Sequence, residues 1–240
     1  MFDSSFDRGD DGIPRSDRRL LWILRIAAAG ALTAVGGSAT GQLPSAPLLQ
    51  NAWAMPGMAA AFNAGSGGGG SVYAAAGSWT PASARFQISG GVGSQTLSGI
   101  GTSWAYGARA AMPLGNPQAN IGFAAFAGIG GASAVNRSAD TTLSDTTTTL
   151  ASRIPVGLSV GWRHAIGSRG FSVYASPAYV WLTGNGQSKG LLRTGIGADV
   201  GVTSSIGLTG GVEFGQTSAI VGAPTGTVYG LGVSYAFGKR

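Results

Sequence analysis

The sequence predicts an all-β protein, a closed antiparallel barrel of ten strands that crosses a membrane. Long stretches alternate between a large apolar residue and a small one, which is the period of a β-strand. Only 10% of the residues are charged, against about 25% in soluble domains. The runs have about the 9–11 residues that a tilted membrane strand needs. Because lipid cannot satisfy an open sheet edge, such a sheet must close on itself.

The N-terminal part of the chain is expected to lie outside the barrel. Basic residues precede an apolar stretch at 26–35, and small residues stand just before a cut after residue 41, which is typical of a signal peptide. We therefore expect residues 1–41 to be a signal peptide and residues 42–56 a short N-terminal lead on the periplasmic side. Residues 57–240 are then the barrel.

Ten alternating runs follow, separated by turn residues. The predicted strands are 57–65, 71–80, 84–95, 101–113, 119–131, 151–165, 171–183, 191–203, 206–216 and 226–237. The first run is the least regular, so the alternative is an eight-stranded barrel with residues 42–80 outside it. Alternate connections are short, and the others include the stretch 133–152. This predicts short periplasmic turns and longer extracellular loops.

The charged residues indicate which face of each strand points inward. In five runs, all six charged residues fall on the small-residue face, and we expect them in the lumen: Arg85, Arg109, Arg163, Arg193, Asp199 and Glu213. An arginine on the lipid face at the bilayer midplane would cost about 2–4 kcal/mol. The large apolar residues are therefore predicted to face lipid.

Strand pairing predicts which lumen charges meet. Folding the eighth and ninth runs about Ser204 sets Asp199 opposite Thr209 and leaves Arg193 one diagonal from Glu213. Folding the third and fourth runs about residues 97–98 brings Arg85 near Arg109.

Two functions are compatible with such an interior. Eight strands are just filled by side chains and the diameter grows with strand number, so ten strands lined by Gly, Ala and Ser predict a water-filled lumen. With its excess of arginine, this lumen would be a narrow passive channel with weak anion preference. The alternative is a closed structural or adhesive barrel, rigidified by its salt bridges, that binds an external partner through the 133–152 loop.

Catalysis is not expected. Gly157–Gly161 matches the G-x-S-x-G pattern, but it lies within a predicted strand, whereas that motif needs a strand-to-helix turn. The spacing places His164 and Ser159 on opposite faces. Without cysteine and with one histidine, the chain offers no thiolate or His-rich metal site. We expect no cofactor, and no nucleic-acid partner because the basic residues are scattered singly.

The C-terminal stretch YGLGVSYAF combines a glycine, alternating apolar residues and a late aromatic residue. With the alternation over 57–237, it resembles the small bacterial outer-membrane β-barrel family. The resemblance implies that Gly230, Val233, Tyr235 and Phe237 form a signal read by the barrel-assembly machinery. It also implies a Gram-negative outer-membrane location after signal-peptide cleavage, with outer-membrane lipid around the barrel. We expect a porin-like monomer, with small anionic solutes as its other partners.

Overall fold

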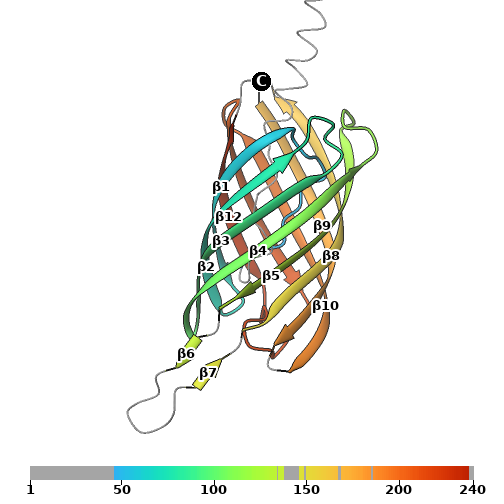
Figure 1. Ribbon diagram of the computed structural model, residues 1–240. Helices are drawn as coiled ribbons and strands as arrows, with labels where there is room; N and C mark the ends of the chain where they lie inside the picture. The colour runs from blue at the N-terminus through green and yellow to red at the C-terminus, as the bar shows by residue number, and fades with distance from the viewer. Residues whose placement is uncertain are drawn as a thin grey trace, which may run out of the picture.

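The computed structural model describes residues 46–133, 135–137, 146–148, 150–166, 169–184 and 186–237. The predicted signal peptide lies outside these residues. Ten antiparallel strands form a closed barrel (Figure 1), which confirms the predicted fold and excludes the eight-stranded alternative. In ring order the barrel strands are β1 (Gly57–Gly67), β12 (Val228–Phe237), β11 (Ile206–Gly215), β10 (Gln187–Gly201), β9 (Arg169–Gly184), β8 (Ser152–Ile166), β5 (Ile121–Ala132), β4 (Gly101–Leu114), β3 (Gln87–Leu97) and β2 (Gly70–Thr80).

Two ends of the barrel are distinguished by their connections. We call the end where β1 begins and β12 finishes the turn-side end, and the opposite one the loop-side end. Two loop-side connections are long, 133–151 and 216–227. The first of these contains the short strands β6 (Val135–Arg137) and β7 (Thr146–Thr148), which pair with each other beyond the barrel rim (Figure 1). The other loop-side connections are short because the strands run further than the sequence predicted.

The alternation of the sequence becomes an apolar outer surface. Side chains such as Trp104, 70% exposed, and Leu231, 72% exposed, point outward, while Gln95 and Arg153 on the inner face are buried. Aromatic rings pair near both ends: Trp79 with Phe86 at the turn side and Tyr179 with Trp181 at the loop side. An apolar band with aromatic girdles is the surface of a membrane-spanning barrel. Within the described residues, no helix has the length and hydrophobicity needed to span a bilayer.

The first and last strands close the ring. The register of β1 and β12 runs from Met58 opposite Phe237 to Gly67 opposite Val228. Closure pairs the backbone groups that would otherwise stand unpaired in hydrocarbon. In β12, the side chains of Val233, Tyr235 and Phe237 are exposed on the outer face.

Opposite sides of the barrel differ in height. Strands β8, β9 and β10 have 15, 16 and 15 residues, and we call them the long wall. Strands β1, β2 and β3 have 11 residues each, and we call them the short wall. In the ring, β9 lies opposite β2. The long wall therefore offers extra inner surface.

Candidate functional site: the filled lumen

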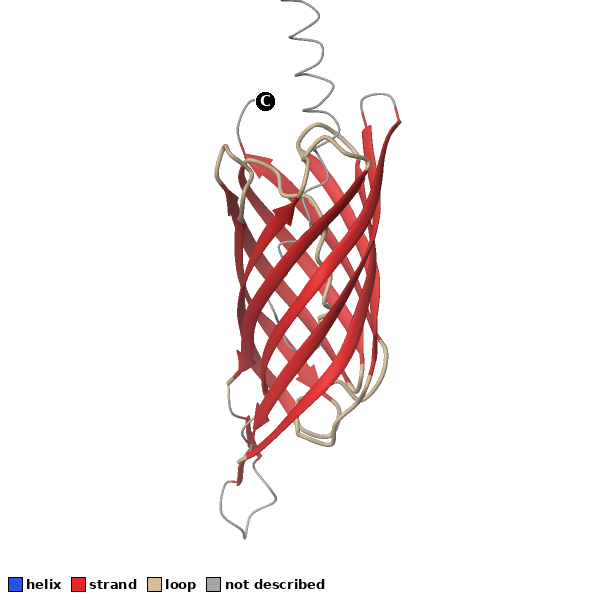
Figure 2. Cartoon of the chain, turned by 90° about the vertical axis from the view of Figure 1, so that its right-hand side faces the viewer, coloured by secondary structure: helices blue, strands red, loops and turns tan. Residues whose placement is uncertain are grey.

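The interior of the barrel is occupied by the chain itself. Residues 46–56, which we call the lumen segment, contain no helix or strand, and residues 46–53 are all buried. Figure 2 shows this segment as a tan trace between the strands. It begins near the loop-side ends of the strands, where Ala46 packs against Val72, and it leaves at the turn-side end, where β1 starts.

The expected lead outside the barrel is therefore wrong for these residues, since they lie within it. The physical reason is that the inner wall supplies partners for their backbone. The N–H of Leu48 donates to Glu213 Oε2 at 2.6 Å, and the N–H of Gln50 donates to Ser176 Oγ at 3.1 Å. The carbonyl oxygen of Gln50 accepts from the hydroxyls of Ser159 and Ser176. A buried backbone without such partners would be costly.

Two arginines hold further carbonyl groups of the segment. Arg109 Nη1 donates to the carbonyl oxygen of Leu49 at 2.7 Å, and Arg153 Nη1 reaches that of Ala46 at 3.4 Å. A hydrogen bond from a charged donor is stronger than one between neutral groups. The wall thus binds the main chain of the segment from several strands at once.

The side chain of Trp53 fills a space left by glycines on β5 and β8. A Cβ atom would lie 2.6 Å from this indole at Gly122 and 2.8 Å from it at Gly161. The guanidinium carbon of Arg163 lies 4.8 Å from the ring centroid, which is cation–π geometry. Any larger residue at these two glycines would collide with the indole.

Glycines on β10 and β11 make room for the leucines in the same way. A Cβ atom at Gly195 would lie 1.8 Å from the carbonyl oxygen of Leu48, and one at Gly211 would lie 2.7 Å from the side chain of Leu49. The small inward residues that predicted a water-filled lumen therefore accommodate a peptide chain along this wall.

The charges of the long wall meet at Glu213 of β11. Arg153 Nη2 lies 3.0 Å from Glu213 Oε1, and Arg193 Nε forms a second ion pair with the same oxygen. Gly195 pairs with Glu213, as the predicted register requires. Arg153 was missed by the sequence analysis, although it shares the alternation phase of Arg163 in the same run.

Asp199 is held by neutral donors. Asn51 Nδ2 of the lumen segment donates to its Oδ2 at 2.6 Å, and the Tyr174 hydroxyl donates to its Oδ1 at 3.1 Å. The same Asn51 amide donates to Ser172 Oγ at 2.9 Å. Thr209 pairs with Asp199 across β10 and β11, in agreement with the prediction.

Arg85 does not belong to the lumen. It is exposed in the turn before β3, which starts at Gln87. The β3–β4 hairpin pairs Ser89 with Arg109, so its centre lies later in the chain than the predicted 97–98. The predicted proximity of Arg85 and Arg109 is wrong for this reason. Arg163, by contrast, points inward and donates to the carbonyl oxygen of Pro117.

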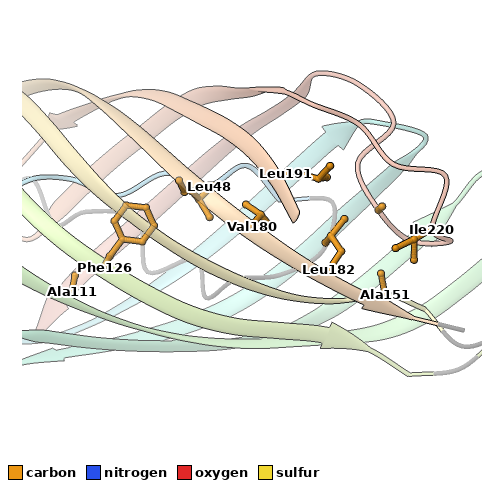
Figure 3. Close-up of a cluster of buried hydrophobic side chains, with 10 residues drawn as sticks. Leu48, Ala111, Phe126, Ala151, Val180, Leu182, Leu191 and Ile220 are labelled. Carbon is orange, nitrogen blue, oxygen red and sulfur yellow. The ribbon is translucent and has the colours of Figure 1, made fainter. Parts of the chain in front are cut away.

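A second element closes the loop-side end. We call residues 216–227 the capping loop. Arg193 donates to the carbonyl oxygens of Gln216 at 2.6 Å and Gly226 at 2.8 Å, near the two ends of this loop. Figure 3 shows Ile220 of the loop beside Leu182 of the long wall, in a cluster of buried apolar side chains. The capping loop thereby covers the extra inner surface of the long wall.

The residues considered for catalysis and metal binding lie apart. Ser159 is buried and bonded to Gln50, whereas His164 is exposed on the other face of β8 and stacks on Trp162 at 5.7 Å between ring centroids. Among the residues that the structure describes, no three His, Cys, Asp or Glu side chains gather as metal ligands. Residues 134, 138–145 and 149 of the 133–152 loop, the predicted contact for a partner, lie outside the described residues.

Solved structures of bacterial β-barrels resemble this chain at a distance. The beta domain of the Bordetella autotransporter Brka shares 14% identity over 75% of this chain and 98% of its own, with a TM-score of 0.48. The N-terminal β-barrel domain of Pseudomonas aeruginosa OprF shares 9% over 75% and 96%, with a TM-score of 0.35. LpxR from Salmonella typhimurium shares 8% over 70% and 73%, with a TM-score of 0.39. No protein-family model and no curated protein matches the chain.

The chain's own geometry defines its class. Ten antiparallel strands, an apolar outer surface and a closed ring make it a transmembrane β-barrel of the bacterial outer-membrane type, as the sequence resemblance implied. Its interior contains residues 46–53 of the chain itself.

Proposed function

We propose that the protein is an outer-membrane barrel whose lumen is sealed by its own lumen segment and capping loop. This corresponds to the closed structural barrel among the two functions that the sequence allowed. The observation that carries the proposal is the burial of residues 46–53 inside the ring, with their backbone bonded to the wall. The buried segment, with Trp53 and the two leucines, takes up space in the lumen that water would otherwise fill, which supports the proposed seal.

The seal also has a mechanical consequence for the barrel. The segment and the Glu213 ion pairs tie β4, β8, β9, β10 and β11 together through the interior. A rigid wall of this kind holds the strand ends from which its outer loops start. The 133–152 loop is the part we propose for contact with an external partner.

A second candidate is a gated anion channel, which one observation favours. If the lumen segment withdrew, the described inner wall would carry four cations against two anions: Arg109, Arg153, Arg163 and Arg193 against Asp199 and Glu213. A pore ringed by excess arginine favours anions. In this function the lumen segment is the gate.

Planar-bilayer recordings distinguish these functions. The full-length protein, refolded in detergent and checked by its shift on gels after boiling, is expected to be electrically silent. Leu48→Lys/Leu49→Lys places two cations among the wall arginines and should expel the segment, while Leu48→Met/Leu49→Met conserves volume and is the control. Anion-selective conductance in the lysine variant alone would show that the segment closes an anion-permeable lumen, and brief anion-selective openings of the native protein would be needed to establish the gated channel. Steady conductance in the native protein would overturn the seal.

A further inference from the structure

We propose that the inner wall is a binding site for an uncharged peptide without regular secondary structure, supplied by another exported polypeptide, and that the lumen segment occupies this site in cis. The inference rests on the proposed sealed lumen. It adds a ligand class: a short uncharged stretch with two adjacent aliphatic residues and an aromatic residue further along.

The first support is that the wall recognises backbone atoms. Glu213 accepts the N–H of Leu48, and Ser176 both accepts the N–H and donates to the carbonyl oxygen of Gln50. Arg109 and Arg153 bind carbonyl oxygens as well. These groups are common to every peptide, so the same contacts are available to a chain of different sequence.

The second support is that the wall contains shaped spaces for side chains. Gly211 admits the side chain of Leu49, and the side chain of Leu48 belongs to the buried apolar cluster that includes Phe126 and Val180. Gly122 and Gly161 admit an indole under the Arg163 guanidinium. These spaces set a preference for an aliphatic pair and for an aromatic ring five residues after its first member.

The third support is the composition of the occupant. Residues 46–56 read APLLQNAWAMP and contain no charged side chain. Apart from Asn51, which meets Asp199 and Ser172, the wall contacts made by this segment use its backbone, its apolar side chains or its indole. A charged peptide would bring additional charges into a wall whose ionic groups already have partners.

The binding of the lumen segment to the wall must be weakened before a second peptide can enter. Covalent attachment gives the segment an effective concentration on the order of millimolar, which raises apparent affinity by about 10²–10⁴ over a free peptide. Native protein should therefore bind a free peptide at least about 100-fold more weakly than a protein whose own segment is displaced.

The test uses a fluorescein-labelled peptide of residues 46–56 and the full-length Leu48→Lys/Leu49→Lys protein in detergent. Fluorescence anisotropy should show saturable binding, about 100-fold tighter than to native protein. A peptide N-methylated at Leu48 and Gln50 keeps every side chain and loses two N–H donors. It should bind about tenfold more weakly or worse, because each donor meets a buried acceptor.

Several outcomes would overturn the inference. Equal affinity for the native and N-methylated peptides would refute backbone recognition, and absence of saturable binding to folded variant protein would refute the site. If the double variant fails the gel-shift test for folding, the Trp53→Lys protein is used in its place, because this substitution displaces the other end of the lumen segment. The proposal of a sealed lumen is tested separately by the conductance of the native protein, a measurement that does not depend on peptide binding.

Discussion

The long wall and the short wall share one alternation pattern but have different interiors. The buried polar residues of β8–β10 include four charged side chains: Arg153, Arg163, Arg193 and Asp199. Those of β1–β3 are uncharged: Asn63, Thr80, Gln87, Ser89 and Gln95. The long wall binds the lumen segment through Ser159, Ser172 and Ser176.

The two walls also differ in how their polar groups are satisfied. Each of these four charged side chains of the long wall has at least one hydrogen-bond or ionic partner. On the short wall, both Gln95 side-chain polar atoms and Asn63 Nδ2 have none within the described protein. Alternation therefore determines that a residue points inward, whereas its partners come from other elements: β11, the capping loop, the lumen segment and the turn that contains Pro117.

The largest effect is expected at the junction of the long wall and β11. Glu213→Gln leaves Arg153 and Arg193 buried without their anion and weakens the acceptor for Leu48. Removing one partner of a buried ionic group costs about 3–5 kcal/mol. Urea unfolding in lipid vesicles measures this loss. A change below about 1 kcal/mol would show that the cluster does not stabilise the long wall.

On the outer surface, an arginine substitution should cost the same stability on the long wall as on the short wall. Leu158 on β8 and Val92 on β3 are 59% exposed each and lie near the middle of their strands. Leu158→Arg and Val92→Arg should each lower the free energy of unfolding in lipid by about 2–4 kcal/mol, since both face hydrocarbon. A penalty on one wall alone would mean that only that wall faces lipid.

Filling a glycine of the long wall that contacts the lumen segment should have a smaller effect. Gly195→Ala forces Leu48 away and should cost about 1–3 kcal/mol, as overpacking does. The control is Gly77→Ala on the outer face of β2, where the nearest atom to an added Cβ is 3.8 Å away. Unfolding midpoints of the two variants give the comparison. If both are equally stable, the lumen segment does not press on β10.

The smallest effect, with the opposite sign, is expected on the short wall. Gln95 is fully buried with its amide unpartnered within the described protein. An unsatisfied buried polar group costs about 1–3 kcal/mol, so Gln95→Leu should raise the free energy of unfolding by about 1 kcal/mol. A loss of stability on this substitution would reveal a partner for the amide, such as a lumen water.

The barrel could be predicted from the sequence because the pattern that specifies it lies in residues close together in the chain. Alternation of period two places Phe126 and Tyr174 inside and Leu158 outside from neighbouring residues alone. Short hairpins extend this to pairs, so the Arg193–Glu213 contact follows from folding β10 on β11 about Ser204. Arg85 was misplaced because this logic is sensitive to the position of the hairpin centre. The β3–β4 turn lies later than predicted, with positive φ at Gly99 in the connection and at Gly101, the first residue of β4.

The filled lumen could not be predicted in this way. Residues 46–56 have no period, and a wall of Gly, Ala and Ser is equally compatible with water and with a peptide chain. The contacts that distinguish these cases join distant parts of the chain: Leu48 and Glu213 are 165 residues apart. The arginines expected to line a water channel instead bind backbone oxygens that carry no sequence signature.

This separation in sequence has a consequence for the order of folding. The lumen segment precedes every strand, yet it is held by the late ones: Leu48 by Glu213 of β11, and Pro47 beside Gly230 of β12. Contacts of such long range form slowly, since most of the chain must be in place first. A chain made from its N-terminus carries the segment long before its binding site exists. The seal therefore forms only on a chain that has been completed through β12.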